Sequence, residues 1–453
     1  MKSFLKRFNV PHVFIFLSAI IVFCSALTYI IPAGQFERET RTVGHMEQTV
    51  VVPGSYKELP KHFSLKGFIL GEKVDGMASP TSLLGLFTSI PKGLNQSAAL
   101  IFFVFTIGAV FNLIRHTGTI HVFIYGLMRR FSRRPNLLIF GIYMAIAFLS
   151  TFLGMGMEFM PLIPLFMIIS KESGYDRVFG LALLAIPFSL GWTAALTNPF
   201  NLQIAQKIAE VPIGSGMGMR LIVFVILLGL GFIYMMRYGK RIKKNPASGV
   251  MPKDPFDLPD DMNTGGHKLE KKHILIVFSA ASLFALILYA VQTMGWGLIE
   301  MTGGFFLVGV VTILISGMSG SESMKAFVQG LEIMIIPALV VGFARGIQVV
   351  MTEGLILDTM LNSTALTLEK LPTFLAVEGM FLFQSFLNFF IPSASGQALV
   401  SMPLMVPLSD LLDITRQTTV LVYTLGDGLS NMIIPTSGVL MAMLGLAGIP
   451  YEK

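Results

Sequence analysis

Apolar runs of about twenty residues recur along this chain and decide what it can fold into. A run of this length crosses the hydrocarbon core of a bilayer as one α-helix. Runs that resemble simple crossings cover residues 12–31, 97–115, 217–236, 273–293, 298–317 and 332–352. Hydrophobic residues make up 53% of the 453 residues and charged residues only 13%, too few to cover a soluble surface. The sequence therefore predicts an all-α polytopic membrane protein that lies in a lipid bilayer.

Basic residues indicate the orientation of the chain. Loops rich in Lys and Arg stay in the cytoplasm, which explains the net charge of +7 without a nucleic-acid partner. Lys2, Lys6 and Arg7 precede the first run, so we expect a cytoplasmic N-terminus. We interpret that run as a span or signal anchor. A cleaved signal peptide is the alternative, but no small-x-small cleavage site precedes Pro32.

Two longer apolar stretches do not resemble simple spans. Residues 137–170 are interrupted by GMGME at 154–158 and have basic flanks, which place both ends inside. Residues 373–408 repeat this design, with IPSASGQ at 391–397 as the tip and acidic flanks that suggest entry from outside. We interpret both stretches as re-entrant helical hairpins.

Each hairpin is followed by a span that begins and then breaks. The spans are 178–211 and 417–449, and the breaks are TNPFN at 197–201 and DGLSNMIIPTSG at 427–438. Proline within a helix frees backbone groups, and lipid cannot satisfy them. For either break alone, a proline kink satisfied by neighbouring helices is the alternative. The sequence predicts two broken transmembrane helices.

The order of span, hairpin and broken span occurs twice, and the copies are offset by about 236 residues, as from Pro199 to Pro435. One extra crossing between the copies would invert the second. Segments 119–128 and 355–362 would lie along the membrane surface as amphipathic helices. The predicted units are a first repeat at 1–236 with an external strand-and-loop excursion at 33–96, a cytoplasmic linker at 237–272, a connecting helix at 273–297 and an inverted repeat at 298–453. The second copy lacks a closing helix, so we expect a shortened chain.

Three charged residues stand within the apolar regions: Glu158, Arg345 and Asp427. Charges in a membrane are costly and mark candidate functional sites. Glu158 and Asp427 are candidate proton carriers or cation ligands; the alternative is that each caps a helix end or binds backbone amides. Arg345 is a candidate anion partner; the alternative is a structural role, either in an ion pair with one of the acids or in binding freed carbonyl groups.

Uncharged polar residues gather at the breaks and at the second tip. Half-helix ends attract ions, and freed carbonyl and side-chain oxygens suit Na⁺. The alternative for each residue is that it only satisfies freed backbone groups. No cofactor or other metal site is expected; Na⁺ or H⁺ would be a coupling ion. The candidate substrate- or ion-binding residues are Asn198, Asn201, Ser393, Ser395, Gln397, Ser430, Asn431, Thr436 and Ser437.

Two other functions fit the sequence less well than a carrier. Intramembrane aspartyl proteases use Tyr-Asp, Gly-x-Gly-Asp and Pro-Ala-Leu. Here Tyr175-Asp176 and Gly426-Asp427 are present, but Pro337-Ala338-Leu339 comes before Gly-Asp and Thr424 replaces the first glycine. A passive channel would need no paired hairpins. We therefore expect a non-enzymatic secondary transporter of a small organic ion.

Several segments also resemble a known family. PHVFIFLSAIIVFCSALTYIIPAGQFER at 11–38, TNPFNLQIAQ at 197–206 and IPSASGQALVSMPLMVPLSDLL at 391–412 are similar to YfcC-like members of the C4-dicarboxylate anaerobic carrier (DcuC-type) family. The resemblance covers nearly the whole chain.

This resemblance implies a carrier of the bacterial inner membrane within the ion-transporter superfamily. Such carriers have two hairpins and two broken helices, and they often form homodimers with elevator-type movement. The implied solutes are C4-dicarboxylates, basic amino acids exchanged by antiport, or short-chain acids. By this similarity, the hairpin tips and breaks would form the binding region.

Overall fold

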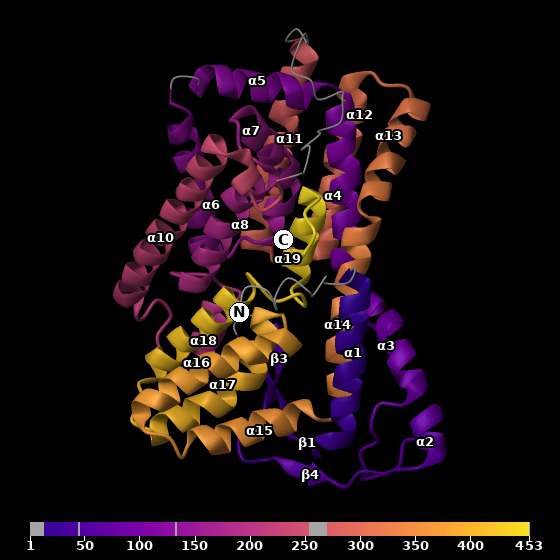
Figure 1. Ribbon diagram of the computed structural model, residues 1–453, viewed down its shortest axis with the longest axis vertical. Coiled ribbons are helices and arrows are strands. Elements are labelled where there is room, and N and C mark those ends of the chain that lie inside the picture. Colours follow the sequence, from indigo (N-terminus) through magenta and orange to yellow (C-terminus); the bar gives the residue numbers. More distant parts are fainter. Residues whose placement is uncertain (1–12, 44–45, 132–133, 253–269, 453) are drawn as a thin grey trace.

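A computed structural model describes residues 13–43, 46–131, 134–252 and 270–452 (Figure 1). These residues are mostly helical, which confirms the predicted all-α polytopic class in its broad form. Seven helical segments among them are long and apolar enough to cross a membrane. They are Ala98–His116, Pro135–Leu153, Arg177–Ala194, Met217–Lys244, Leu298–Ser316, Gly320–Glu353 and Thr373–Phe390.

The helices follow the predicted order along the chain. The first half contains α1 (Val13–Ile30), α2 (Leu65–Ile69), α3 (Leu83–Gln96), α4 (Ala98–His116), α5 (Thr119–Phe131), α6 (Pro135–Leu153), η2 (Met157–Leu162), α7 (Ile163–Glu172), α8 (Arg177–Ala194), α9 (Leu202–Ile208), α10 (Met217–Lys244) and η3 (Pro246–Ser248). The second half contains α11 (Lys271–Met294), α12 (Leu298–Ser316), α13 (Gly320–Ile333), α14 (Ile335–Glu353), α15 (Leu357–Leu368), α16 (Thr373–Phe390), α17 (Ala394–Leu411), α18 (Arg416–Ser430) and α19 (Gly438–Ala447).

Four short strands follow α1. β1 (Ala33–Gln35) pairs antiparallel with β4 (Lys57–Leu59) at the bottom of Figure 1, and β2 (Arg38–Val43) pairs with β3 (Met46–Val51), which extends up beside α17. Asp358 of α15 binds the first part of this region: one carboxylate oxygen pairs with Arg38 at 2.8 Å, and the other accepts the Phe36 amide at 2.9 Å. The residues around β1 and the start of β2 are therefore held against α15.

The predicted excursion at 33–96 also contains a helix that the sequence analysis did not expect. Residues 83–96 form α3, which packs on α14 and leads directly into α4. Its 14 residues are too few for a simple span, and the residues before it are polar, so the sequence did not distinguish this helix from the loop.

The helix pair α3–α4 crosses the helix pair α13–α14 at glycines. A single residue separates α3 from α4, and a single residue separates α13 from α14. A Cβ added to Gly93 would lie 2.4 Å from the Gly342 carbonyl oxygen. One added to Gly330 would lie 2.5 Å from the Gly108 carbonyl oxygen. Because glycine lacks a Cβ, α3 can cross α14, and α4 can cross α13, at backbone contact.

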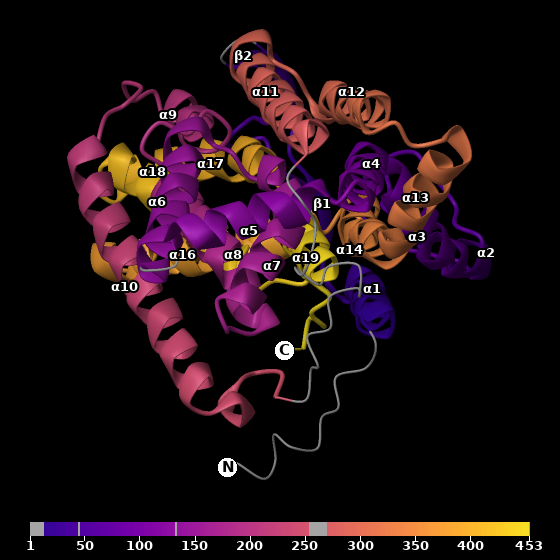
Figure 2. The same ribbon diagram turned by 90° about the horizontal axis from the view of Figure 1, so that it is seen from above.

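The helices form two groups when the molecule is seen from above. α6, α8, α10, α16 and α18 gather on one side, and α3, α4, α12 and α13 on the other (Figure 2). Within the first group, α6, α10 and α18 all pack on α8. α5 and α15 lie at opposite ends of the molecule (Figure 1). Both predicted breaks begin in the first group, where α8 and α18 meet.

Candidate functional site

Both helices that were predicted to break do stop and then resume. The first gap, 195–201, separates α8 from α9, and the second, 431–437, separates α18 from α19. In the first gap, the amides of Leu196 and Thr197 donate to the carbonyl oxygen of Thr151 on α6, at 3.0 and 3.2 Å. Neighbouring protein therefore satisfies the backbone groups that leave the helix, as an apolar surrounding requires.

The last turns of α8 and α18 contact each other. The Trp192 indole on α8 donates to the Asp427 carboxylate on α18. A Cβ added to Gly428 would lie 2.2 Å from Thr193 Oγ1 and 2.6 Å from Thr193 Cα. The backbone of α18 thus lies directly against α8, and the two gaps begin at the same place in the molecule.

Asp427 is the most deeply buried acid of this meeting point. It is one turn before the end of α18, and its side chain has 0% exposure. Trp192 Nε1 donates to Oδ2 at 3.2 Å, and Asn431 Nδ2 donates to Oδ1 at 2.9 Å. Both donors are neutral, and among the described residues no ion pair involves Asp427. A buried carboxylate without a cation is costly. This group is therefore suited to bind a proton or a cation.

Two amides on α16, which the sequence analysis did not single out, join α16 and α17 to this acid. Asn388 Nδ2 donates to the Asp427 carbonyl oxygen at 3.0 Å and to Ser430 Oγ at 2.7 Å. Gln384 Oε1 accepts from Gln397 Nε2 at 2.7 Å and from Ser401 Oγ at 3.1 Å. The available signal was their four-residue spacing within an apolar run, which puts both on one face of a helix.

The asparagines of the first gap satisfy backbone groups. Asn198 Oδ1 accepts the Phe200 amide at 2.8 Å, and Asn201 Nδ2 donates to the Trp192 carbonyl oxygen at 3.1 Å. Both are fully buried. The Asn198 side chain also lies against Gly154, where α6 ends: a Cβ added there would be 2.4 Å from its Oδ1. The structure thus joins the tip after α6 to the first gap.

The remaining uncharged candidates lie at helix starts. Ser393 caps α17 by accepting the Gly396 amide at 3.3 Å, and Ser437 caps α19 by accepting the Leu440 amide at 3.4 Å. Ser395 and Gln397 belong to the first turn of α17, because that helix begins inside the predicted tip at 391–397.

Three buried oxygens of α16, α17 and the second gap have no hydrogen-bond partner among the described residues. Two are side-chain amide oxygens of the α16–α17 pair, and the third is a hydroxyl in the second gap. They are Asn388 Oδ1, Gln397 Oε1 and Thr436 Oγ1. Neutral oxygens of this kind can act as ligands of a monovalent cation, as the Asp427 carboxylate can.

Of the other two charged candidates, Arg345 lies apart from Asp427. Arg345 is half-buried on α14, outside the first group of helices. Its Nε is buried without a partner, and no ion pair among the described residues links it to Asp427. Glu158 follows the tip in η2, but its side chain lies outside the described residues. The ion pair between Arg345 and Asp427 that charge alone suggested is therefore not formed.

Arg220 is a buried cation that the sequence analysis missed. It lies in the first turn of α10 and is 1% exposed. Its Nη1 donates to the Ala194 carbonyl oxygen, where α8 ends, at 3.3 Å, and to Thr424 Oγ1 of α18 at 3.0 Å. An arginine near the end of an apolar run usually extends to the membrane surface. Only the tertiary contacts show that this one turns inward.

Comparisons with known proteins identify the family of this chain. The family described as C4-dicarboxylate anaerobic carrier (DcuC) matches residues 10–453. The chain belongs to this family. A relative from Escherichia coli K12, named "Putative basic amino acid antiporter YfcC", is 32% identical over 99% of this chain and 92% of its own length. An uncharacterized protein of Haemophilus influenzae is 23% identical over 99% of this chain and 93% of its own length.

Two solved transporters resemble this DcuC-family chain more distantly. The Alcanivorax borkumensis YdaH transporter aligns over 96% of this chain and 91% of its own, with 17% identity and a TM-score of 0.42. Neisseria gonorrhoeae MtrF, described as one of a class of antimetabolite efflux pumps, aligns over 97% and 89%, with 18% identity and a TM-score of 0.39.

The protease alternative does not fit this DcuC-family structure. Asp176 caps the first turn of α8 by accepting the Phe179 amide at 2.8 Å. Trp192, which contacts Asp427, lies near the other end of the same helix. At about 1.5 Å per residue, Asp176 and Trp192 are roughly 24 Å apart along α8, so the carboxylates of Asp176 and Asp427 are too distant to share a proton.

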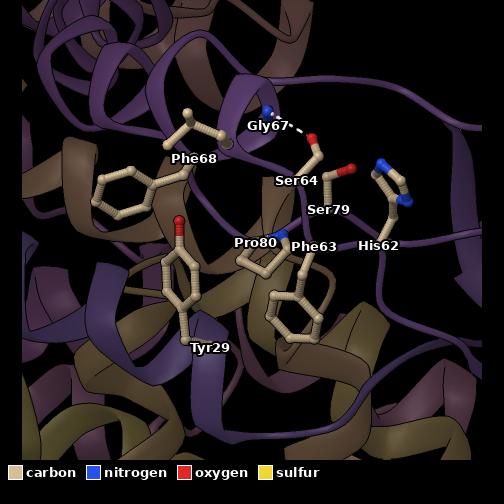
Figure 3. A pocket seen from close by; sticks show the side chains of 9 residues that line it. Tyr29, His62, Phe63, Ser64, Gly67, Phe68, Ser79 and Pro80 are labelled. Carbon is tan, nitrogen blue, oxygen red and sulfur yellow. Dashed lines mark hydrogen bonds between the residues drawn. The ribbon is translucent and has the colours of Figure 1, made fainter.

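Two cavities of the DcuC-family chain lie away from Asp427. One, of about 320 Å³, is lined by Tyr29, His62, Phe63, Ser64 and Phe68 and lies beside α2 (Figure 3). The other, of about 260 Å³, has apolar walls from α4, α5, α7, α11 and α12. Neither includes a residue of the two gaps.

Proposed function

We propose that this carrier-family chain is a secondary active transporter of a small organic ion. The observation that carries the proposal is Asp427, a fully buried carboxylate that only neutral donors hold, at the point where two interrupted helices meet. A group of this kind can bind a proton or cation in one conformation and release it in another. Transport would be coupled to H⁺ or Na⁺, or would proceed by exchange.

The proposal includes an inverted repeat with two re-entrant hairpins, α6–α7 and α16–α17. Two observations support it. Gly93 contacts Gly342 where α3 crosses α14, and Gly330 contacts Gly108 where α13 crosses α4. Gly330 lies 237 residues after Gly93, close to the offset of about 236 between the copies, so an exchange of the copies would convert one crossing into the other. The surface helices α5 and α15 also lie at opposite ends of the molecule, as inversion requires (Figure 1).

The proposed solute is an amino acid, basic amino acids included, or a C4-dicarboxylate. The family description supports the dicarboxylate, and the name of the Escherichia coli relative supports the amino acid. We further propose elevator-type alternating access in a homodimer of the bacterial inner membrane, with the N-terminus in the cytoplasm. The two groups of helices in Figure 2 would then be the moving and the fixed parts.

A proteoliposome screen tests this function. Labelled arginine, ornithine and succinate are each offered with an imposed Na⁺ gradient, an H⁺ gradient, unlabelled solute inside, or none of these. We expect one solute to accumulate above its external concentration under one driving force only. If uptake of every solute stops when its internal and external concentrations are equal, the protein is a passive channel instead.

A further inference from the structure

Arg220 keeps one edge of its guanidinium free of protein partners. Its Nη1 bonds to Ala194 and Thr424, whereas Nε and Nη2 are buried and have no hydrogen-bond partner among the described residues. Nε and Nη2 form the side of the planar fork that binds a carboxylate through two parallel hydrogen bonds. An arginine that is 1% exposed and has this edge unused therefore points to a ligand that supplies two acceptor oxygens.

The free edge belongs to the meeting point of the two interrupted helices. Ala194 is the last residue of α8, and Thr424 lies one turn before Asp427 on α18. Residues three apart on a helix have Cβ atoms about 5–6 Å apart. Nevertheless, Arg220 and Asp427 form no ion pair within 4.0 Å among the described side chains. A buried cation and a buried anion thus lie near the same point without neutralising each other.

We propose that the Nε–Nη2 edge of Arg220 binds a carboxylate group of the transported solute. This inference rests on the proposed function and narrows its substrate class to solutes with a carboxylate. Amino acids and C4-dicarboxylates both have one. Arg220 Nε and Nη2 are both buried, which fits a conformation in which the site is closed to both sides of the membrane.

The test compares how strongly a free acid and its methyl ester inhibit uptake. Labelled ornithine is competed with ornithine or its methyl ester, and labelled succinate with succinate or its dimethyl ester, in proteoliposomes of the full chain. For the transported solute, we expect the free acid to inhibit on the order of 100-fold better than the ester, as for loss of one partner of a buried charge pair. Arg220→Lys keeps the charge but loses the fork, so this preference should fall to within a few fold.

Arg237→Gln is the matched control, because Arg237 is exposed towards the far end of the same helix, α10. It should keep the full preference for the acid. The preference is a ratio, so it does not depend on how much protein folds. If Arg220 serves only to cap α8, Arg220→Gln and Arg220→Lys will lower the thermal midpoint but leave the ratio unchanged, which overturns this inference alone. Uptake of neither solute by the unsubstituted chain would overturn the proposed function and the inference with it.

Discussion

At the scale of single residues, Asp427 is held by hydrogen bonds from neutral groups rather than by an ion pair. Asp427→Asn keeps the shape of the side chain but replaces one carboxylate oxygen with an NH₂ group. That NH₂ group then faces a donor, either Trp192 Nε1 or Asn431 Nδ2, and one hydrogen bond is lost. We expect a moderate loss of about 1–2 kcal/mol in the free energy of unfolding, measured as a lower thermal midpoint in detergent.

Arg345 provides the control for this prediction. If the two residues were a hidden ion pair, Asp427→Asn would leave an unpaired buried charge at a cost of roughly 3–5 kcal/mol. Arg345→Gln would then rescue the single variant. The structure has no such pair, so we expect the two losses to add. Rescue in the double variant would contradict the geometry described above.

The residue scale also shows what sequence reasoning can and cannot find. The breaks and Asp427 were predictable, because prolines and a charge in an apolar run conflict with a simple span. Arg220 and Asn388 were not, because their roles depend on partners distant in sequence: Thr424 for the first and Asp427 for the second. The alternative in which Arg345 pairs with Asp427 failed because charge alone does not say which helices are neighbours.

At the scale of elements, the contact between α8 and α18 depends on Gly428. A Cβ there would lie 2.6 Å from the Thr193 Cα, so the backbones would have to separate. We expect Gly428→Ala to destabilise the protein by about 1–3 kcal/mol in the thermal midpoint assay. Gly229→Ala on α10 is the matched control, because nothing lies within 4 Å of its added Cβ. It should be neutral or stabilising, since alanine favours a helix interior. Equal effects of the two substitutions would show that α8 and α18 do not approach as described.

The corner between α17 and α18 allows a prediction about pH. Arg416 Nη2 donates to the Asp410 carboxylate at 2.7 Å, and its Nη1 donates to Glu210, beyond α9, at 2.9 Å. The hydrogen bond from Arg416 holds the pKa of Asp410 below its ordinary value. A depressed acid pKa stabilises the fold above the unfolded pKa of about 3.9, and this contribution is lost as pH falls through the folded pKa.

The difference in thermal midpoint between the unsubstituted chain and Asp410→Asn should therefore be constant from neutral pH down to about pH 5. It should shrink towards zero below about pH 3.9. Thermal scans of both proteins across this range measure it. A difference that grows on acidification would mean that the carboxylate does not stabilise the corner.

At the scale of the whole molecule, the proposed inversion predicts opposite exposure of two segments. A cysteine introduced at Asn245, after the basic end of α10, should react with an impermeant thiol reagent only from the cytoplasm. One at Ser363 on α15 should react only from outside. Cys24 is buried and provides little background. A third expected cytoplasmic position, Arg133, lies outside the described residues. Labelling of Ser363 from inside would place the α16–α17 pair on the wrong face and end the inverted-repeat proposal.

Most of the helical architecture followed from the apolar runs, because membrane spans are set by length and hydrophobicity. The structure added what those runs cannot encode. α3 was missed because its 14 residues are too few for a simple span, and the start of α17 lies within the predicted tip. Close helix crossings at Gly93 and Gly330 depend on tertiary contacts. The sequence therefore left open one short helix, several element boundaries and the partners of the helices.

Gradient-driven accumulation by the unsubstituted chain and by Asp427→Asn, in proteoliposomes matched for protein content, shows whether the Asp427 carboxylate couples transport to an ion gradient. The unsubstituted chain should concentrate its labelled solute above the external level under an imposed H⁺ or Na⁺ gradient. The asparagine variant, which cannot exchange a proton at this position, should lose accumulation, whereas any exchange of labelled for unlabelled solute can persist. Normal accumulation by Asp427→Asn would contradict the role given to this carboxylate, and uptake by the unsubstituted chain that never exceeds the external level would contradict secondary active transport.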